Sequence, residues 1–123
     1  MGKIRIERLN KELQRILNIA VTSKARDPRL TWVSITEVRV SKDMQHARVY
    51  YSYLEDSSVT PEVMQGVMTR LTGFMKRQIA AAHIMRVIPE ITIVYDEVEQ
   101  RAGRLDNIFQ KLQNENDRDT DED

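Results

Sequence analysis

The sequence contains two histidines and no cysteine, so few side chains are suited to nucleophilic, acid–base or metal chemistry. His46 lies three residues after Asp43 in a predicted turn, and His83 lies in a predicted helix. Neither histidine has partners at metal-ligand spacing, and no nucleophile-elbow, zinc-protease, P-loop or dinucleotide-binding motif is present. A hydrolase built on Asp43 and His46 is one alternative, but structural roles fit both histidines better. We therefore expect no enzyme, cofactor, metal or small-molecule substrate.

Basic side chains offer a different chemistry, because the first thirty residues hold eight bases and three acids. If residues 4–22 form a helix, three of these bases lie along one outer ridge, from which they can follow a phosphate backbone. The alternative is a solvated face with Glu7–Lys11 and Arg8–Glu12 pairs at i,i+4 spacing. The predicted RNA contacts in this part of the chain are Arg8, Lys11 and Arg15 on the ridge and Lys24, Arg26 and Arg29 after it.

A second basic cluster occurs between Val63 and Pro89, a segment with no acidic residue. Its cations flank Leu71-Thr72-Gly73, where the helical pattern is interrupted and a kink would expose backbone N–H groups to phosphate. The G-x-x-G loop of KH domains is absent here, so any RNA would be bound by shape and charge. The predicted RNA contacts of this cluster are Arg70, Lys76, Arg77 and Arg86.

The elements that position these cations follow from hydrophobic period and turn chemistry. The pattern predicts a helix over 4–22, then two antiparallel strands over 31–40 and 46–53, with a β-bulge near Thr36-Glu37. Thr60-Pro61 begins a helix that breaks near Gly73 and resumes to about Met85. An apolar run over 91–95 predicts a strand buried on both faces. A weaker helix follows, from about Val98 to Leu112.

The resulting α-β-β-α-α-β order predicts an α+β domain of the type II KH-like fold over residues 1–113, with a three-stranded sheet covered on one face by helices. Residues 114–123 hold six acids and one arginine, a net charge of −5, so the rest of the chain carries +5. This tail is expected to be disordered and solubilising; alternatively, it competes with RNA for the basic body. Apolar runs are too short to cross a membrane. The absence of cysteine fits a reducing cytoplasm.

Several segments resemble bacterial ribosome-binding factor A. The hairpin segment 40–50 is similar to the family pattern Val-Ser-[Arg/Lys]-Asp followed by His-Ala-[Arg/Lys]-Val-Tyr. The resemblance extends over residues 5–112 in matching order and includes the basic first helix. Its other matching segments are Asp27-Pro28-Arg29-Leu30, Arg86-Val87-Ile88-Pro89-Glu90, Tyr95-Asp96 and Gly103-Arg104-Leu105.

The resemblance implies a monomeric cytoplasmic factor that binds 16S ribosomal RNA on the immature small (30S) ribosomal subunit. Such a factor would assist late maturation and leave before translation begins. It also implies a helix–kink–helix in place of the G-x-x-G loop. The family kink is usually Ala-x-Gly, and Leu71 replaces the alanine in this sequence. A protein-interaction module that uses a sheet edge or the C-terminal helix remains the alternative function.

Overall fold

The computed structural model of the chain describes residues 2–54 and 59–97. The predicted order α-β-β-α-α-β and the α+β class are confirmed. The C-terminal helix predicted after Val98, the domain boundary at residue 113 and the acidic tail lie outside the described residues. The helices and strands are α1 (Gly2–Ile19), β1 (Val33–Val40), β2 (His46–Tyr53), α2 (Pro61–Arg70), α3 (Thr72–Ala82) and β3 (Glu90–Tyr95).

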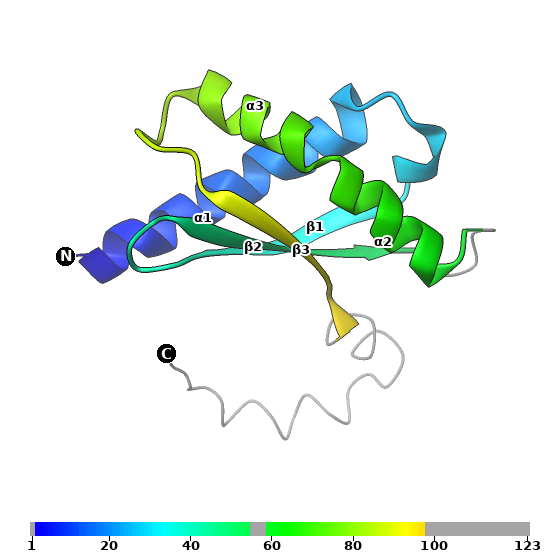
Figure 1. Cartoon of the computed structure of the whole chain (residues 1–123), viewed down its shortest axis with the longest axis horizontal. Coiled ribbons are helices and arrows are strands. Elements are labelled where there is room, and N and C mark those ends of the chain that lie inside the picture. Colours follow the sequence, from blue (N-terminus) through cyan, green and yellow to red (C-terminus); the bar gives the residue numbers. More distant parts are fainter. Residues whose placement is uncertain (1, 55–58, 98–123) are drawn as a thin grey trace.

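The three strands form one sheet in the order β1-β2-β3. β1 pairs antiparallel with β2, and β3 pairs parallel with β2 after the crossover through α2 and α3. The three helices lie on the same side of the sheet, where α1 crosses the α2–α3 pair (Figure 1). The core therefore lies between the helices and one face of the sheet.

The first helix runs as predicted and continues two residues further. A π-helical turn, Ala20–Lys24, extends α1, and Asp27-Pro28 then begins a short 3₁₀ turn. The predicted apolar stripe is buried at its centre, with Leu13 and Leu17 almost inaccessible to solvent. This burial holds the helix on the sheet, because most helical stability in proteins comes from packing an apolar face.

A β-bulge interrupts the β1–β2 ladder at the predicted place. Ile35 pairs with Tyr51 and Glu37 pairs with Tyr50, which leaves Thr36 as the extra residue. The Thr36 hydroxyl donates a hydrogen bond to the Asp96 carboxylate over 2.6 Å. The bulge therefore directs a β1 side chain toward the end of β3, although β2 lies between the two strands.

The outer edge of β1 is covered by polar side chains from α1. The amide of Gln14 donates to the Ile35 carbonyl over 2.8 Å, and the Ile35 N–H donates to the Asn18 side-chain oxygen over 2.8 Å. Further along, the Val40 N–H donates to the Asn10 side-chain oxygen over 2.9 Å. These bonds satisfy backbone groups of a strand edge that would otherwise be open to pairing.

The expected break between α2 and α3 is present, centred on Leu71. Thr60 caps α2 by accepting a hydrogen bond from the Val63 N–H, and Pro61 is its first residue, as predicted. Gly73 lies inside α3 without a positive φ, so its conformational freedom does not produce the break. α3 ends at Ala82, earlier than the predicted Met85, because His83 adopts the left-handed conformation (φ 56°).

The prediction that residues 91–95 form a strand buried on both faces is wrong. β3 is an edge strand in which only Ile93 is fully buried, while Thr92 is exposed and Val94 is half-buried. Within the described residues, helices cover only one face of the sheet (Figure 1). An apolar run alone does not distinguish a doubly buried strand from a half-buried one.

Candidate nucleic-acid interface

The predicted α1 ridge is present: Arg8, Lys11 and Arg15 are all exposed. Glu12 forms an ion pair with Arg15, and this hydrogen bond lowers the pKa of the Glu12 carboxyl. The alternative Arg8–Glu12 pair does not form, so the Arg8 guanidinium has no acidic partner among the described residues. Two of the three ridge cations thus remain available to a phosphate.

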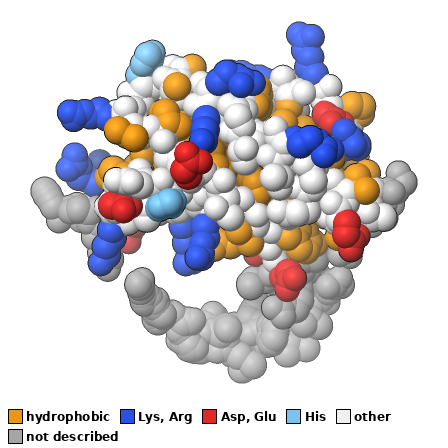
Figure 2. Space-filling model, viewed as in Figure 1, with side chains coloured by type: hydrophobic (Ala, Val, Ile, Leu, Met, Phe, Trp, Pro, Cys, Tyr) orange, Lys and Arg blue, Asp and Glu red, His pale blue; other side chains and the backbone are white. Residues whose placement is uncertain are grey.

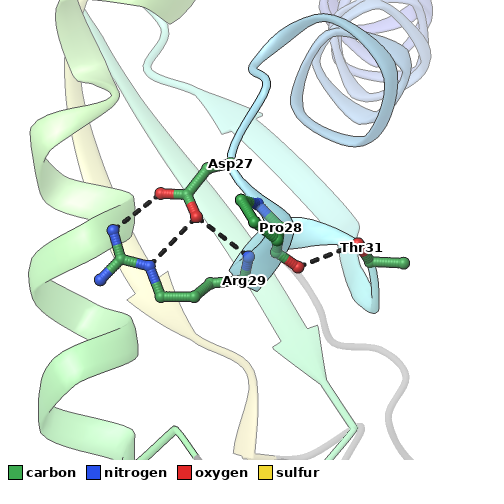
Figure 3. A network of polar contacts seen from close by, with 4 residues as sticks. All are labelled: Asp27, Pro28, Arg29 and Thr31. Atoms are coloured by element: carbon green, nitrogen blue, oxygen red, sulfur yellow. Dashed lines mark hydrogen bonds and ion pairs between the residues drawn. The ribbon is translucent and has the colours of Figure 1, made fainter.

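A tight polar turn follows α1 (Figure 3). The Asp27 carboxylate accepts hydrogen bonds from the Arg29 backbone N–H at 2.9 Å and from its guanidinium at 3.1 and 2.8 Å. These bonds, first of all the one from the side chain, hold the pKa of Asp27 below its usual range, and the Arg70 charge adds to the effect. Arg29 and Arg70, predicted as separate contacts, therefore both lie within electrostatic reach of Asp27.

The prediction that the second cluster faces no acid is wrong for Lys76. Its ammonium lies 3.0 Å from the carboxylate of Glu90, which follows Pro89 directly and is the first residue of β3. Arg77 and Arg86 are exposed and form no ion pair with a described residue. The ion pair could not be recognised from a local sequence pattern, because Lys76 and Glu90 are fourteen positions apart.

A cation of α3, Arg77, lies beside the first turn of the same helix. No side chain caps the start of α3, whereas Thr60 caps α2. The Leu71 N–H donates to Met68, and the Met75 N–H donates to Leu71 over 2.8 Å, so the two helices share continuous backbone bonding through the break. Arg77 extends back toward Gly73, where its guanidinium would lie 3.7 Å from an added Cβ. Of the predicted kink residues Leu71, Thr72 and Gly73, the glycine is thus next to a cation.

One hollow brings together cations that lie far apart in the sequence. The start of α1, the β1–β2 turn and the segment after α3 enclose about 470 Å³, with Arg5, Arg8, Asp43, Arg86 and Val87 among the lining residues. We call this space the arginine hollow. It joins two predicted contacts, Arg8 and Arg86, and adds Arg5, which the sequence reasoning did not select. The signal for Arg5 was its position three residues before Arg8 on the same helix.

The turn residue Asp43 serves the hairpin instead of an acid–base pair. Its carboxylate accepts hydrogen bonds from the Ser41 hydroxyl at 2.7 Å and the Gln45 N–H at 3.0 Å. These bonds, led by the one from Ser41, lower the pKa of the Asp43 carboxyl. Among the described residues, no group of three or more histidine, cysteine, aspartate or glutamate side chains is arranged to hold a metal ion. No helix in this part of the chain is long and apolar enough to span a membrane.

Trp32 is a second residue that the sequence reasoning did not select for function. Its side chain is 65% exposed in the turn between Arg29 and β1. An exposed indole offers a flat apolar face that a base can stack on. Tyr50, by comparison, is half-buried on β2 opposite Glu37.

Cations are spread over the described face as several groups. Figure 2 shows Lys and Arg side chains at both ends of this face and along its upper margin, with some acidic side chains among them. Three of the ten predicted contacts, Arg15, Arg29 and Lys76, are engaged in ion pairs. Seven form none with a described residue: Arg8, Lys11, Lys24, Arg26, Arg70, Arg77 and Arg86.

The described fold is a mixed α+β domain with a kinked helix pair, a single three-stranded sheet and basic groups on its surface. The family model described as Ribosome-binding factor A matches residues 5–109. A Streptococcus mutans ribosome-binding factor A is 32% identical over 94% of this chain and 100% of its own length. The chain belongs to the ribosome-binding factor A family.

Solved structures agree with this assignment. A Thermotoga maritima protein assigned to ribosome binding factor A is 34% identical, with a TM-score of 0.60 over 72% of this chain and 84% of that one. The crystal structure of ribosome-binding factor A from Thermus thermophilus has a TM-score of 0.64 over 73% of this chain and 94% of that one. At 23% identity this second likeness supports the fold alone.

Proposed function

We propose that this chain is a cytoplasmic, monomeric assembly factor that binds 16S ribosomal RNA on the immature small ribosomal subunit. It assists late maturation by binding and not by catalysis. A coordinate set of the Thermus thermophilus protein, 24% identical to this chain, was fitted into a map of a 30S–RbfA complex. That complex and the shared family support the proposal for this chain.

The observation that carries the proposal is the set of seven predicted cations that form no ion pair with a described residue. An unpaired surface arginine or lysine keeps its full charge for an external anion. Phosphate is the anion that RNA presents at regular intervals, and each contact releases counterions. The three paired cations would have to exchange an internal carboxylate for a phosphate, so we expect them to contribute less.

The mechanism would be occupancy: the protein acts by remaining bound to its site on the RNA. A factor that binds one arrangement of the RNA more tightly than another shifts the RNA toward that arrangement by its differential affinity. Dissociation from the mature subunit follows if the favoured arrangement is lost on maturation. No step in this account needs a cofactor or a chemical group beyond the basic side chains.

Sedimentation with ribosomal particles tests the proposal. Tagged protein should co-migrate with small subunits or their precursors on a low-salt sucrose gradient and should leave them at high salt. The logarithm of affinity should fall with the logarithm of salt concentration, with a slope of about −0.7 to −0.9 per phosphate contact. Protein that stays at the top of the gradient at low salt contradicts the proposal.

Charge reversal tests the residues separately from the family assignment. The triple variant Arg8→Glu, Arg70→Glu and Arg77→Glu should abolish co-migration and keep the circular dichroism spectrum of the parent protein. The matched control reverses Arg15, Arg29 and Lys76, which are already paired. Equal loss in both triple variants would contradict the assignment of the unpaired cations.

A further inference from the structure

The arginine hollow has one charged side and one apolar side. Three guanidiniums, those of Arg5, Arg8 and Arg86, line it, and each is exposed without an ion pair to a described residue. Among the described residues of the lining, Asp43 is the one acid, and its carboxylate is already bonded to Ser41 and Gln45. The lining therefore has a surplus of positive charge that is open to an anion.

The apolar side is formed by the segment between α3 and β3. Val87 is 67% exposed and Ile84 is 37% exposed, although both are apolar. Met85 lies between them, partly buried against the core. Exposed single apolar residues are ordinary, but here two of them stand in the same hollow as three unpaired cations. Apolar surface beside guanidinium groups fits a ligand that has both a flat unsaturated ring and a phosphate.

The walls of the hollow are held in place by the backbone. The Glu90 N–H donates to the Gln45 carbonyl over 2.9 Å, which ties the segment after α3 to the β1–β2 turn. Met44, in the part of the lining that the β1–β2 turn supplies, adopts the left-handed conformation at φ 62°. His83, at φ 56°, turns the chain at the end of α3 immediately before Ile84.

We propose that the arginine hollow binds a single unpaired nucleotide of the RNA. The base lies against Ile84, Met85 and Val87, and the flanking phosphates contact Arg5, Arg8 and Arg86. A volume of about 470 Å³ falls within the usual range for small-ligand sites. A base stacked in a duplex cannot present its face to a wall, so the hollow selects single-stranded or extruded nucleotides. This inference rests on the proposed function and names the RNA element that this site recognises.

The test separates the base from the phosphates. Full-length protein with isotope-labelled isoleucine, methionine and valine methyl groups is titrated with single-stranded hexa-adenylate, followed by NMR. The comparison ligand is an abasic hexamer, which has the same phosphates without bases. Hexa-adenylate should shift the methyl signals of Ile84, Met85 and Val87 and should bind at least about fivefold more tightly than the abasic hexamer. Equal affinities, or shifts confined to other methyl groups, overturn the inference.

Substitutions test the apolar side and the charged side of the arginine hollow separately. Val87→Ser should reduce the preference for hexa-adenylate over the abasic hexamer, and it should leave the fold intact because the Val87 side chain is exposed. Arg86→Gln should weaken both ligands. The matched control is Arg48→Gln, which removes an exposed cation of β2 that forms no ion pair with a described residue and lies outside the hollow. Equal weakening by Arg86→Gln and Arg48→Gln would mean general charge attraction and would overturn the inference.

Two further outcomes separate this inference from the proposed function. If the protein co-migrates with small subunits while hexa-adenylate leaves the hollow methyl signals unchanged, the nucleotide site is wrong and the proposed function stands. If hexa-adenylate fills the hollow but no co-migration occurs, the proposed function fails and the nucleotide site stands. A pentapeptide of four glutamates and one phenylalanine is the protein-like comparison. Binding of this peptide as tightly as hexa-adenylate would overturn the assignment to RNA.

Discussion

Tyr51 connects the sheet to the helical layer through both packing and a hydrogen bond. Its ring lies 5.5 Å from the Tyr95 ring in an edge-on arrangement and 6.5 Å from the Tyr53 ring. Its hydroxyl donates to the Gln65 side-chain oxygen on α2 over 2.9 Å, and the Gln65 amide donates to the Ile93 carbonyl over 3.1 Å. One side chain thus joins β2, α2 and β3.

Tyr51→Phe should lower the free energy of unfolding by about 1 kcal/mol, because the Gln65 oxygen loses its donor in a partly buried place. Urea denaturation followed by circular dichroism at pH 7 measures the change. Tyr50→Phe is the control, since the Tyr50 hydroxyl forms no hydrogen bond with a described residue. A Tyr51 variant as stable as the control would contradict this role for the hydroxyl.

The same tyrosine predicts a loss of stability in alkali. Burial, with the neighbouring Tyr53 and Tyr95, raises the pKa of Tyr51 from 10.0 to about 12. Because the folded state holds this proton more tightly than the unfolded state, the contribution is complete below pH 10 and is lost as the pH rises toward 12. Unfolding free energies at pH 9 and 11 should therefore differ more for the parent protein than for Tyr51→Phe. An identical pH dependence of the two proteins would contradict the assignment.

For single residues, the sequence is a better guide to burial than to the formation of ion pairs. Ala47, Val49, Tyr51 and Tyr53 alternate along the sequence and form the buried face of β2, because period-two patterning follows directly from strand geometry. The Lys76–Glu90 pair could not be predicted in the same way. It depends on how α3 lies over β3, and no local pattern carries that information.

At the scale of elements, α1 has three sides, and the sequence analysis identified two of them. The apolar stripe and the basic ridge were predicted, but the polar stripe of Asn10, Gln14 and Asn18 was not. Its spacing of four residues was a usable signal, since residues at i and i+4 share a helix face. Because this stripe covers β1, a partner strand could not add to that edge without displacing α1 side chains. The alternative of a protein-interaction module therefore finds no support at the β1 edge.

Asn18→Ala should lower the free energy of unfolding by about 1–2 kcal/mol, because the part-buried Ile35 N–H loses its acceptor. Lys11→Ala is the matched control on the same helix, where an exposed side chain is removed without loss of an ion pair. Thermal or urea denaturation of both variants measures the difference. If the two variants have the same free energy of unfolding, water replaces the Asn18 side chain as the acceptor of the Ile35 N–H without loss of stability.

Substitution of Gly73 tests whether the break between α2 and α3 requires a glycine. It is helical and exposed, and a Cβ added there would meet only the Arg77 guanidinium at 3.7 Å, an ordinary contact. Gly73→Ala should therefore stabilise the protein by about 0.5–1 kcal/mol through helix propensity. Gly66→Ala in α2, with its nearest contact at 3.6 Å, is the matched control and should give a similar gain. Destabilisation by Gly73→Ala alone would mean that the kink does require the glycine.

At the scale of the whole molecule, the basic groups are defined by the fold more than by the sequence. The arginine hollow joins Arg8 to Arg86 across nearly the whole described chain, a proximity that requires α1 and the segment before β3 to meet at one end of the sheet. Composition predicted only a surplus of five positive charges outside the last ten residues. The order of elements was predictable because each has a local signal, whereas the hollow was not, because it exists only after the elements pack.

The opposite charges of the body and the last ten residues predict a role in selectivity. Residues 114–123 carry −5, and the remainder of the chain carries +5. Acidic groups tethered to a basic body compete with any polyanion, and they do so most effectively against RNA that offers only phosphate contacts. Deletion of residues 114–123 should therefore strengthen binding to polyuridylate several-fold at low salt, measured by fluorescence anisotropy.

The control for this deletion is a full-length variant in which the six acids of residues 114–123 are changed to their amides. It keeps the length of the tail and removes its negative charge, so it should bind polyuridylate as tightly as the deletion variant does. The unfolding free energy of both proteins is measured as well, and values within about 0.5 kcal/mol of the parent mean that a change in binding does not come from a change in the fold. If the amide variant binds like the parent protein while the deletion variant binds more tightly, bulk and not charge restricts the RNA. If neither variant binds more tightly, the acidic residues do not compete with RNA.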